Sequence, residues 1–294
     1  MHRALPFFGE QSEFEHTPLK WAELPGLCCQ AAGGDPRWVD GFAAAWLLYY
    51  VAAHIMDKVE DHDILEGIWE EWRPRVSINI ASGLYFSASL LLTDLNTSQK
   101  YPSLVSEINR DFYQAFLRMC SGQQRDLTQP EPSLADFWDN ANDKSGIFFS
   151  IACRLGARFA TSDNLKLECY EEYGRNIGIL IQILDDLEDY QGSGEGFGKV
   201  DTHVIRRSLP VIYALEVLPE QETILLEEEL GQALNHQAAE AAYKRIEKSG
   251  ATLYIITEME RLRSQARTSL ERAQPEQPAD KVLYNMLGDL TYQF

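Results

Sequence analysis

Two short acidic stretches follow long apolar runs in this chain. HIMDKVEDHD comes directly after the uncharged run GFAAAWLLYYVAA and contains Asp57 and Asp61, and LIQILDDLEDYQG contains Asp185 and Asp189. In each stretch the two aspartates stand four positions apart, so a helix places both on one face. Like charges at this spacing destabilise a helix slightly, and two such clusters are harder to explain as solvated helix ends than one. Carboxylates facing each other across a helical bundle can hold a hard divalent cation such as Mg²⁺.

The bulk composition narrows the classes of function. The chain has 294 residues, of which 45% are apolar, and a formal net charge of −19 at pH 7. A nucleic-acid-binding protein needs a cationic face, and adsorption to anionic lipid needs basic residues, so the charge disfavours both. An acidic protein that handles an anionic substrate needs local positive charge from metal ions or from a few placed lysines and arginines.

The cysteines and the longest uncharged run bear on location. The five cysteines form neither a C-x-x-C pair nor a zinc-binding spacing, which indicates reduced thiols. The first residues lack the apolar core of a signal peptide. The uncharged run from residue 41 to residue 56 is short for a membrane span, so we expect a buried helix there. These features predict a cytoplasmic protein without a membrane span.

The spacing of apolar residues predicts an all-α fold. Apolar positions recur at intervals of three and four through most of the chain, without the sustained alternation typical of strands. Breakers such as QGSGEGFGK and AQPEQPAD separate the helical segments, and no linker marks a second domain. We predict one domain, a bundle of orthogonal and antiparallel helices over 31–294, preceded by a segment 1–30 of unclear role. The predicted helices are 36–66, 75–96, 99–122, 134–160, 164–191, 202–217, 220–232, 235–248, 250–273 and 279–292.

Further motifs stand in a particular order along the chain. SGQQRDL is followed by DKSGIFF, then by Gln182 and DDLED, then by a Gly-Lys pair that ends in Lys199, and then by RRSLPVIYAL, which begins at Arg206. This ordered set resembles the trans-isoprenyl diphosphate (polyprenyl) synthases of the class I terpenoid synthase superfamily, which carry two DDxxD motifs on facing helices. DDLED matches the second motif. DKVED resembles a degenerate first motif, because Lys58 stands where the family has its second aspartate.

The resemblance implies the isoprenoid synthase fold, with a central apolar cavity, and a magnesium-dependent transfer of prenyl groups by a homodimer. Three Mg²⁺ ions would grip the diphosphate of an allylic prenyl diphosphate, whose departure leaves an allylic cation. The double bond of isopentenyl diphosphate would attack that cation and give a longer polyprenyl diphosphate. The implied metal ligands are Asp57, Asp61, Asp185, Asp186 and Asp189; the implied catalytic residues are Asp57, Asp61, Asp185, Lys144 and Lys199; the implied substrate-binding residues are Lys144, Gln182, Lys199, Arg206 and Arg37.

The chain departs from the family pattern where the acceptor should bind. GGDPRW stands where the family has GGKR-x-RP, so an aspartate replaces the lysine and only Arg37 remains. The arginine pair that follows the first motif in the family is also missing, and only WRPR, with Arg73 and Arg75, comes after it. Three alternatives in the same fold therefore stay open. They are a class I terpene synthase that uses no isopentenyl diphosphate, a head-to-head synthase of the squalene type, and a non-catalytic subunit of a heteromeric prenyl synthase.

Overall fold

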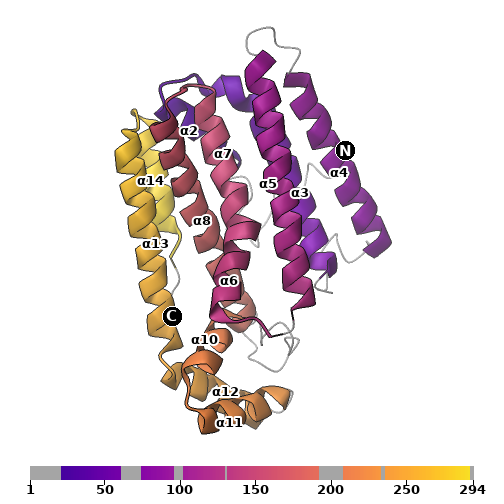
Figure 1. The fold of residues 1–294 in the computed structure, drawn as a ribbon, viewed down its shortest axis with the longest axis vertical. Coiled ribbons are helices and arrows are strands. Elements are labelled where there is room, and N and C mark those ends of the chain that lie inside the picture. The colour runs from indigo at the N-terminus through magenta and orange to yellow at the C-terminus, as the bar shows by residue number, and fades with distance from the viewer. Residues whose placement is uncertain are drawn as a thin grey trace, which may run out of the picture.

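The computed structural model describes residues 21–60, 74–95, 102–129, 131–191, 208–232 and 236–291, and every regular element within these ranges is helical. Figure 1 shows long helices packed side by side in one body, with the short helices α10, α11 and α12 gathered at one end of it. The elements are α2 (Leu24–Ala31), η2 (Pro36–Val39), α3 (Asp40–Glu60), α4 (Pro74–Asp94), α5 (Pro102–Thr128), α6 (Leu134–Ala141), η5 (Asn142–Gly146), α7 (Ile147–Arg158), α8 (Asn164–Gln191), α10 (Leu209–Val217), α11 (Glu220–Gly231), α12 (His236–Lys248), α13 (Ala251–Ala273) and α14 (Ala279–Asp289).

The predicted all-α fold is confirmed, with one informative difference. The segment predicted as a single helix over 134–160 consists of α6, a five-residue π-helical turn η5, and α7. At its start, Ser133 accepts a hydrogen bond from the backbone N–H of Asp136, whose carboxylate accepts one from the N–H of Ser133, so a capping box begins α6. The π-helical turn shifts the register of the side chains between α6 and α7.

One large apolar core joins most of the bundle. It contains residues from α2, α3, α5, α7, α8, α13 and α14, and its largest fully buried side chains include Trp46, Tyr170 and Tyr173. A second, smaller core lies among α10, α11 and α12, where Leu226 and Ile246 are fully buried. This core also contains Tyr190 of α8 and Ala251 at the start of α13, so the short helices pack both on one another and on the bundle.

Residues 21–30, from the segment to which the sequence assigns no role, contribute to the main core. Trp21, Leu24 and Cys28 are buried, and α2 packs chiefly against α7. The ring of Trp21 meets the ring of Phe149 on α7 edge to face, with 5.6 Å between the ring centroids. The helix is only eight residues long, so its amphipathic pattern is too short to stand out in the sequence.

Two helical stretches, Pro36–Glu60 and Pro74–Asp94, are long and apolar enough to cross a membrane by length and composition alone, among the residues described. Core helices of soluble proteins meet the same criterion, and α3 contributes Phe42, Trp46 and Ile55 to buried clusters. In the other stretch, α4, 22% of the most apolar window is buried, and Phe86 and Leu90 are among its exposed residues.

Helices α7 and α8 approach so closely that glycine is required between them. A Cβ added to Gly178 on α8 would lie 2.2 Å from the carbonyl oxygen of Ser145, and one added to Gly174 would lie 2.3 Å from the carbonyl oxygen of Phe149. Real Cβ atoms do not come this near to backbone atoms. The two glycines therefore set the distance between α8 and the segment that carries η5.

This contact generates a stability prediction. Gly178→Ala should force the helices apart and lower the free energy of unfolding by about 1–3 kcal/mol, the usual cost of overpacking a core. Gly288→Ala on α14 is the matched control, because a Cβ there meets nothing within 4 Å. It should leave stability unchanged or raise it by up to ~1 kcal/mol through helix propensity. Urea unfolding followed by circular dichroism measures both, and equal stability of the two variants would contradict the close packing.

Candidate active site

The first acidic motif lies near the carboxyl end of α3. Asp57 is in the last turn of this helix and its side chain is 41% exposed, so the carboxylate is open to solvent and to a ligand. Glu60, one turn later, accepts a hydrogen bond of 2.9 Å from the amide Nε2 of Gln123 on α5. Asp61 lies outside the described residues. The described part of the motif thus sits at the junction of α3 and α5.

A single lysine bridges the first motif and α5. The Nζ atom of Lys144, in the π-helical turn η5, lies 2.9 Å from Oδ2 of Asp126 and 3.4 Å from Oδ1 of Asp57. The Lys144 side chain is only 16% exposed. A partly buried ammonium between two carboxylates offsets part of their mutual repulsion. Asp126 is the aspartate of the SGQQRDL stretch, and it was not among the predicted site residues.

Two arginines of α5 hold the π-helical turn in place. Asp143, next to Lys144, accepts hydrogen bonds from Nε of Arg118 at 2.7 Å and from a terminal nitrogen of Arg125 at 2.6 Å. Nε of Arg125 also donates to the side-chain oxygen of Asn140 at 3.1 Å. These contacts neutralise Asp143, so the lysine that follows it interacts with Asp57 and Asp126 instead.

The second acidic motif comes to the same turn from α8. The hydroxyl of Ser145 donates to Oε1 of Gln182 at 2.8 Å, and Gln182 lies one helical turn before Asp185. Asp185 is exposed. Asp186 accepts a hydrogen bond of 2.6 Å from the backbone N–H of Leu209, the first residue of α10, so this carboxylate also anchors the end layer of short helices.

The π-helical turn therefore connects the two motifs. Lys144 contacts Asp57 of the first, and the next residue, Ser145, contacts the helix turn that leads into the second. Of the remaining predicted site residues, Lys199 and Arg206 lie outside the described residues, as does the side chain of Asp189. Within the described part of the chain no three acidic, histidine or cysteine side chains are already grouped to hold a metal ion.

The chemistry of the donors still fits Mg²⁺. Asp57 and Asp185 offer exposed carboxylate oxygens, which this hard cation prefers, and Mg²⁺ usually takes only one or two protein carboxylates together with water and phosphate oxygens. Cysteine and histidine do not take part in either described motif. The residues that would hold the metal are thus Asp57 and Asp185, with Asp61 and Asp189 as the predicted partners four positions further on.

The structure does not bring Arg37 to this site. Arg37 lies in η2, ahead of α3, whereas Asp57 is 17 residues beyond Asp40 at the start of that helix. At about 1.5 Å per residue, some 25 Å separates the two ends. The guanidinium is also engaged locally, since its Nε lies 3.0 Å from Oδ1 of Asp35. Sequence proximity to a Gly-Gly pair was thus a poor guide to where this arginine lies.

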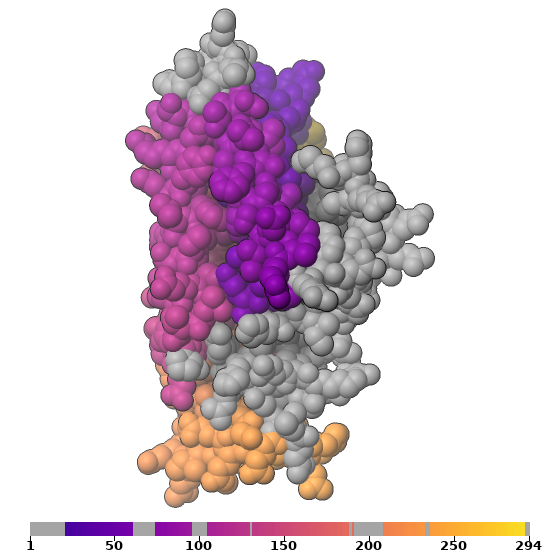
Figure 2. All heavy atoms as spheres, turned by 90° about the vertical axis from the view of Figure 1, so that its right-hand side faces the viewer, coloured from indigo at the N-terminus to yellow at the C-terminus, as the bar shows by residue number. Residues whose placement is uncertain are grey.

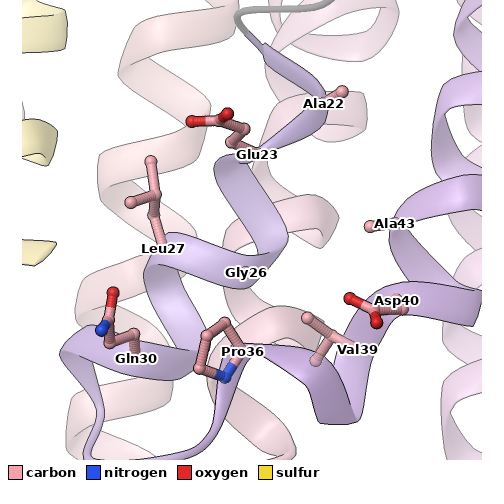
Figure 3. Close-up of a pocket in the computed structure, with 9 residues that line it drawn as sticks. All are labelled: Ala22, Glu23, Gly26, Leu27, Gln30, Pro36, Val39, Asp40 and Ala43. Carbon is pink, nitrogen blue, oxygen red and sulfur yellow. The ribbon is translucent and has the colours of Figure 1, made fainter.

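A pocket lies at that same far end. Figure 3 shows it at α2, η2 and the start of α3, lined by Glu23 and Leu27 at α2, by Pro36 and Val39 in η2, and by Asp40 at the start of α3. Its volume is about 320 Å³. Asp40 begins the helix that carries Asp57 near its other end, so this pocket is separate from the acidic motifs.

Comparisons with known proteins identify the family of the chain. A sequence model of the polyprenyl synthetase family matches residues 37–246. A geranylgeranyl diphosphate synthase of Mycobacterium tuberculosis is 29% identical over 214 residues, which cover 69% of this chain and 60% of that protein. The tryptophan prenyltransferase ComQ of Bacillus subtilis subsp. natto is also 29% identical, over 184 residues that cover 63% of this chain and 54% of that protein. The matched part of the chain thus spans less than two thirds of either relative.

Solved structures share the fold. The geranylgeranyl pyrophosphate synthetase of Pyrococcus horikoshii aligns with a TM-score of 0.80 at 19% identity, covering 99% of this chain and 89% of that one. The family match extends over more than two thirds of the sequence and includes both acidic motifs, Lys144 and Gln182. The chain therefore belongs to the polyprenyl synthetase family.

Proposed function

We propose that the protein transfers a prenyl group from an allylic prenyl diphosphate to an acceptor, with Mg²⁺ as cofactor. The observation that carries this proposal is the convergence of Asp57, Lys144 and the Gln182–Asp185 turn on one π-helical turn. In the reaction the bond between C1 of the prenyl chain and the diphosphate oxygen breaks, and its electron pair leaves with pyrophosphate. A carbon–carbon double bond of the acceptor attacks C1, and a proton is then lost.

The charges of the site support a role for metal ions. A diphosphate that approaches Asp57 and Asp185 meets like charge, and Lys144 is already shared between Asp57 and Asp126. Bound Mg²⁺ would supply the missing positive charge and stabilise the pyrophosphate as it leaves. Asp57, Asp61, Asp185 and Asp189 are the proposed ligands, and three ions is the number that the family resemblance implies. Asp186 would contribute less directly to metal binding, because its carboxylate accepts a hydrogen bond from the first residue of α10.

Isopentenyl diphosphate is the acceptor that the family resemblance implies, and condensation with it would give a longer polyprenyl diphosphate. A second candidate is the indole ring of a tryptophan. Two observations favour it. The predicted acceptor-binding Arg37 lies about 25 Å along α3 from Asp57. ComQ, a tryptophan prenyltransferase, is as identical to this chain over its aligned part as the geranylgeranyl diphosphate synthase is, at 29%. The two candidates share the allylic diphosphate and differ in the acceptor, which the second prediction below tests.

We also propose that two copies associate through the exposed face of α4 and α5. Figure 2 looks onto these two helices, which adjoin on this side of the molecule. Phe86 and Leu90 on α4 are 72% and 65% exposed, and Leu117 on α5 is 67% exposed. No charged residue occurs between Arg75 and Asp94. In a chain with a net charge of −19, the uncharged surface of α4 is where two copies meet with the least repulsion.

The first prediction tests the metal-binding motifs. Asp57→Asn and Asp185→Asn should each lower turnover at least ~100-fold, because each removes charge that holds Mg²⁺ against the diphosphate. Asp185→Asn should lower turnover at least as much as Asp57→Asn does, because the motif DDLED is intact whereas DKVED is degenerate. Pyrophosphate release at increasing Mg²⁺ measures both, with Asp111→Asn on α5 as the control that should match the wild type. Wild-type rates in both motif variants would refute the assignment.

The second prediction concerns the acceptor. The protein is incubated with C10, C15 and C20 allylic diphosphates and Mg²⁺, alone, with isopentenyl diphosphate, or with a tryptophan-containing peptide, and the products are identified by mass spectrometry. A longer diphosphate supports condensation, and a prenylated peptide supports transfer to indole. A hydrocarbon or alcohol without an acceptor would indicate a terpene synthase, and a doubled chain a head-to-head synthase. No pyrophosphate release under any condition would refute catalysis by this chain alone.

The third prediction tests the association. Light scattering after gel filtration should give a mass near twice the 33.4 kDa of one chain. Leu90→Glu should shift it to the monomer, because a charge would be buried in the interface. Leu253→Glu on α13 is the control, since Leu253 is similarly exposed at 70% and lies on another helix. A monomeric wild type, or one that binds neutral lipid vesicles through this face, would contradict the proposal.

A further inference from the structure

Asp126 on α5 holds the lysine of the π-helical turn more closely than the first acidic motif does. The Nζ atom of Lys144 lies 2.9 Å from Oδ2 of Asp126, whereas its distance to Oδ1 of Asp57 is 3.4 Å. The side chain of Asp126 is 27% exposed, against 41% for Asp57. The ion pair with Asp126 is therefore both the shorter one and the one less screened by water.

A glycine of α5 lets the lysine reach this aspartate. Gly122 stands one helical turn before Asp126, so both residues lie on the same face of the helix. A Cβ added to Gly122 would lie 3.1 Å from the Cβ of Asp143 and 3.4 Å from the Cγ of Lys144. Because position 122 carries no side chain, the aliphatic part of Lys144 passes close along α5 toward the Asp126 carboxylate.

The carboxylate next to the lysine in the sequence is already engaged. Asp143 accepts a hydrogen bond from Arg118 at 2.7 Å and another from Arg125 at 2.6 Å. These two guanidinium groups balance its charge, so Asp143 does not draw the ammonium of Lys144 out of the site. The ammonium contacts one carboxylate of the first acidic motif and one that lies outside both motifs.

An ammonium at Asp57 and a metal ion at Asp57 oppose each other. Both are cations, so each repels the other at the same carboxylate, and the ammonium offsets part of the charge that would attract Mg²⁺. The diphosphate nevertheless gains from having both, because a lysine donates charge-assisted hydrogen bonds to phosphate oxygens. The site therefore needs a second carboxylate that keeps the lysine nearby without leaving it on the metal ligand.

We infer that Asp126 is this carboxylate, a positioning residue that keeps Lys144 from competing with Mg²⁺ for Asp57. The inference rests on the proposed function and adds one residue to its site. Asp126 acts through the lysine and takes no part as a metal ligand. In its absence the nearer ion pair is lost, so the ammonium moves onto Asp57 and weakens the binding of the metal ion there.

Metal binding measured without turnover tests the inference. Isothermal titration with MgCl₂, alone and at a fixed concentration of inorganic pyrophosphate, gives the apparent affinity of each variant. Asp126→Asn should weaken Mg²⁺ binding about tenfold, and Lys144→Met alone should change it at most about twofold. The double variant should return to within about threefold of the wild type, because removal of the competing ammonium makes Asp126 unnecessary.

This rescue distinguishes positioning from the general effect of charge. Loss of a nearby negative charge weakens a cation with or without the lysine, so its effect would simply add to that of Lys144→Met. Asp111→Asn is the matched control, since it removes a carboxylate from the same helix about four turns before Asp126 and should bind Mg²⁺ like the wild type. Asp126→Ser repeats the cycle with a different uncharged side chain, and circular dichroism checks that each variant is folded.

The outcomes separate this inference from the function beneath it. Weak Mg²⁺ binding in Asp126→Asn that Lys144→Met restores supports the inference. Additive effects, or Mg²⁺ binding in Asp126→Asn equal to that of the wild type, overturn it and leave the proposed prenyl transfer intact. A folded wild type that binds no Mg²⁺ under either condition, and releases no pyrophosphate from allylic diphosphates, overturns both.

Discussion

The close approach of α7 and α8 is the constraint on which the site depends. Glycines at 174 and 178 let the backbone of one helix lie against carbonyl oxygens of the other, at a distance that no larger residue permits. Only at this distance does Ser145 reach Gln182, and only then does the π-helical turn place Lys144 beside Asp57. A π-helical turn inside a longer helix is costly and is frequent at functional sites. Here it turns consecutive residues toward two different acidic helices.

The π-helical turn needs basic residues around it, because several carboxylates lie close to it. Asp57, Asp126 and Asp143 all lie within reach of the segment, and an unbalanced group of this kind would repel itself. Arg118 and Arg125 take up Asp143, and Lys144 is shared between the other two. Asp186 meanwhile binds the N-terminus of α10, where the helix dipole favours a negative charge. The second motif is thereby tied to the end layer of short helices as well as to the bundle.

The periodicity of apolar residues was enough to predict the helices, because long amphipathic segments leave a strong pattern. The periodicity could not reveal η5, because a π-helical turn adds one residue to a turn of helix. This shifts the register of the side chains that follow without changing the composition of the segment. The periodicity also missed α2, whose eight residues contain too few turns to show a pattern. The acidic motifs were recognisable by type and spacing. Arg37 was assigned by its neighbours in sequence, and only the length of α3 shows that these neighbours lie at the wrong end of the bundle.

The charged groups of the site and the apolar core beneath them have separate tasks. The groups proposed to hold the diphosphate stand near the ends of α3 and α8 and in η5, whereas Trp46 and Phe148, further along the bundle, are packed together in the main core. Packing in the core therefore fixes where the two acidic motifs lie, and leaves the carboxylates of Asp57 and Asp185 facing solvent and ligand. On the proposed mechanism these groups govern the loss of pyrophosphate, which comes before any acceptor attacks. The nature of the acceptor thus places no demand on the carboxylates or on Lys144.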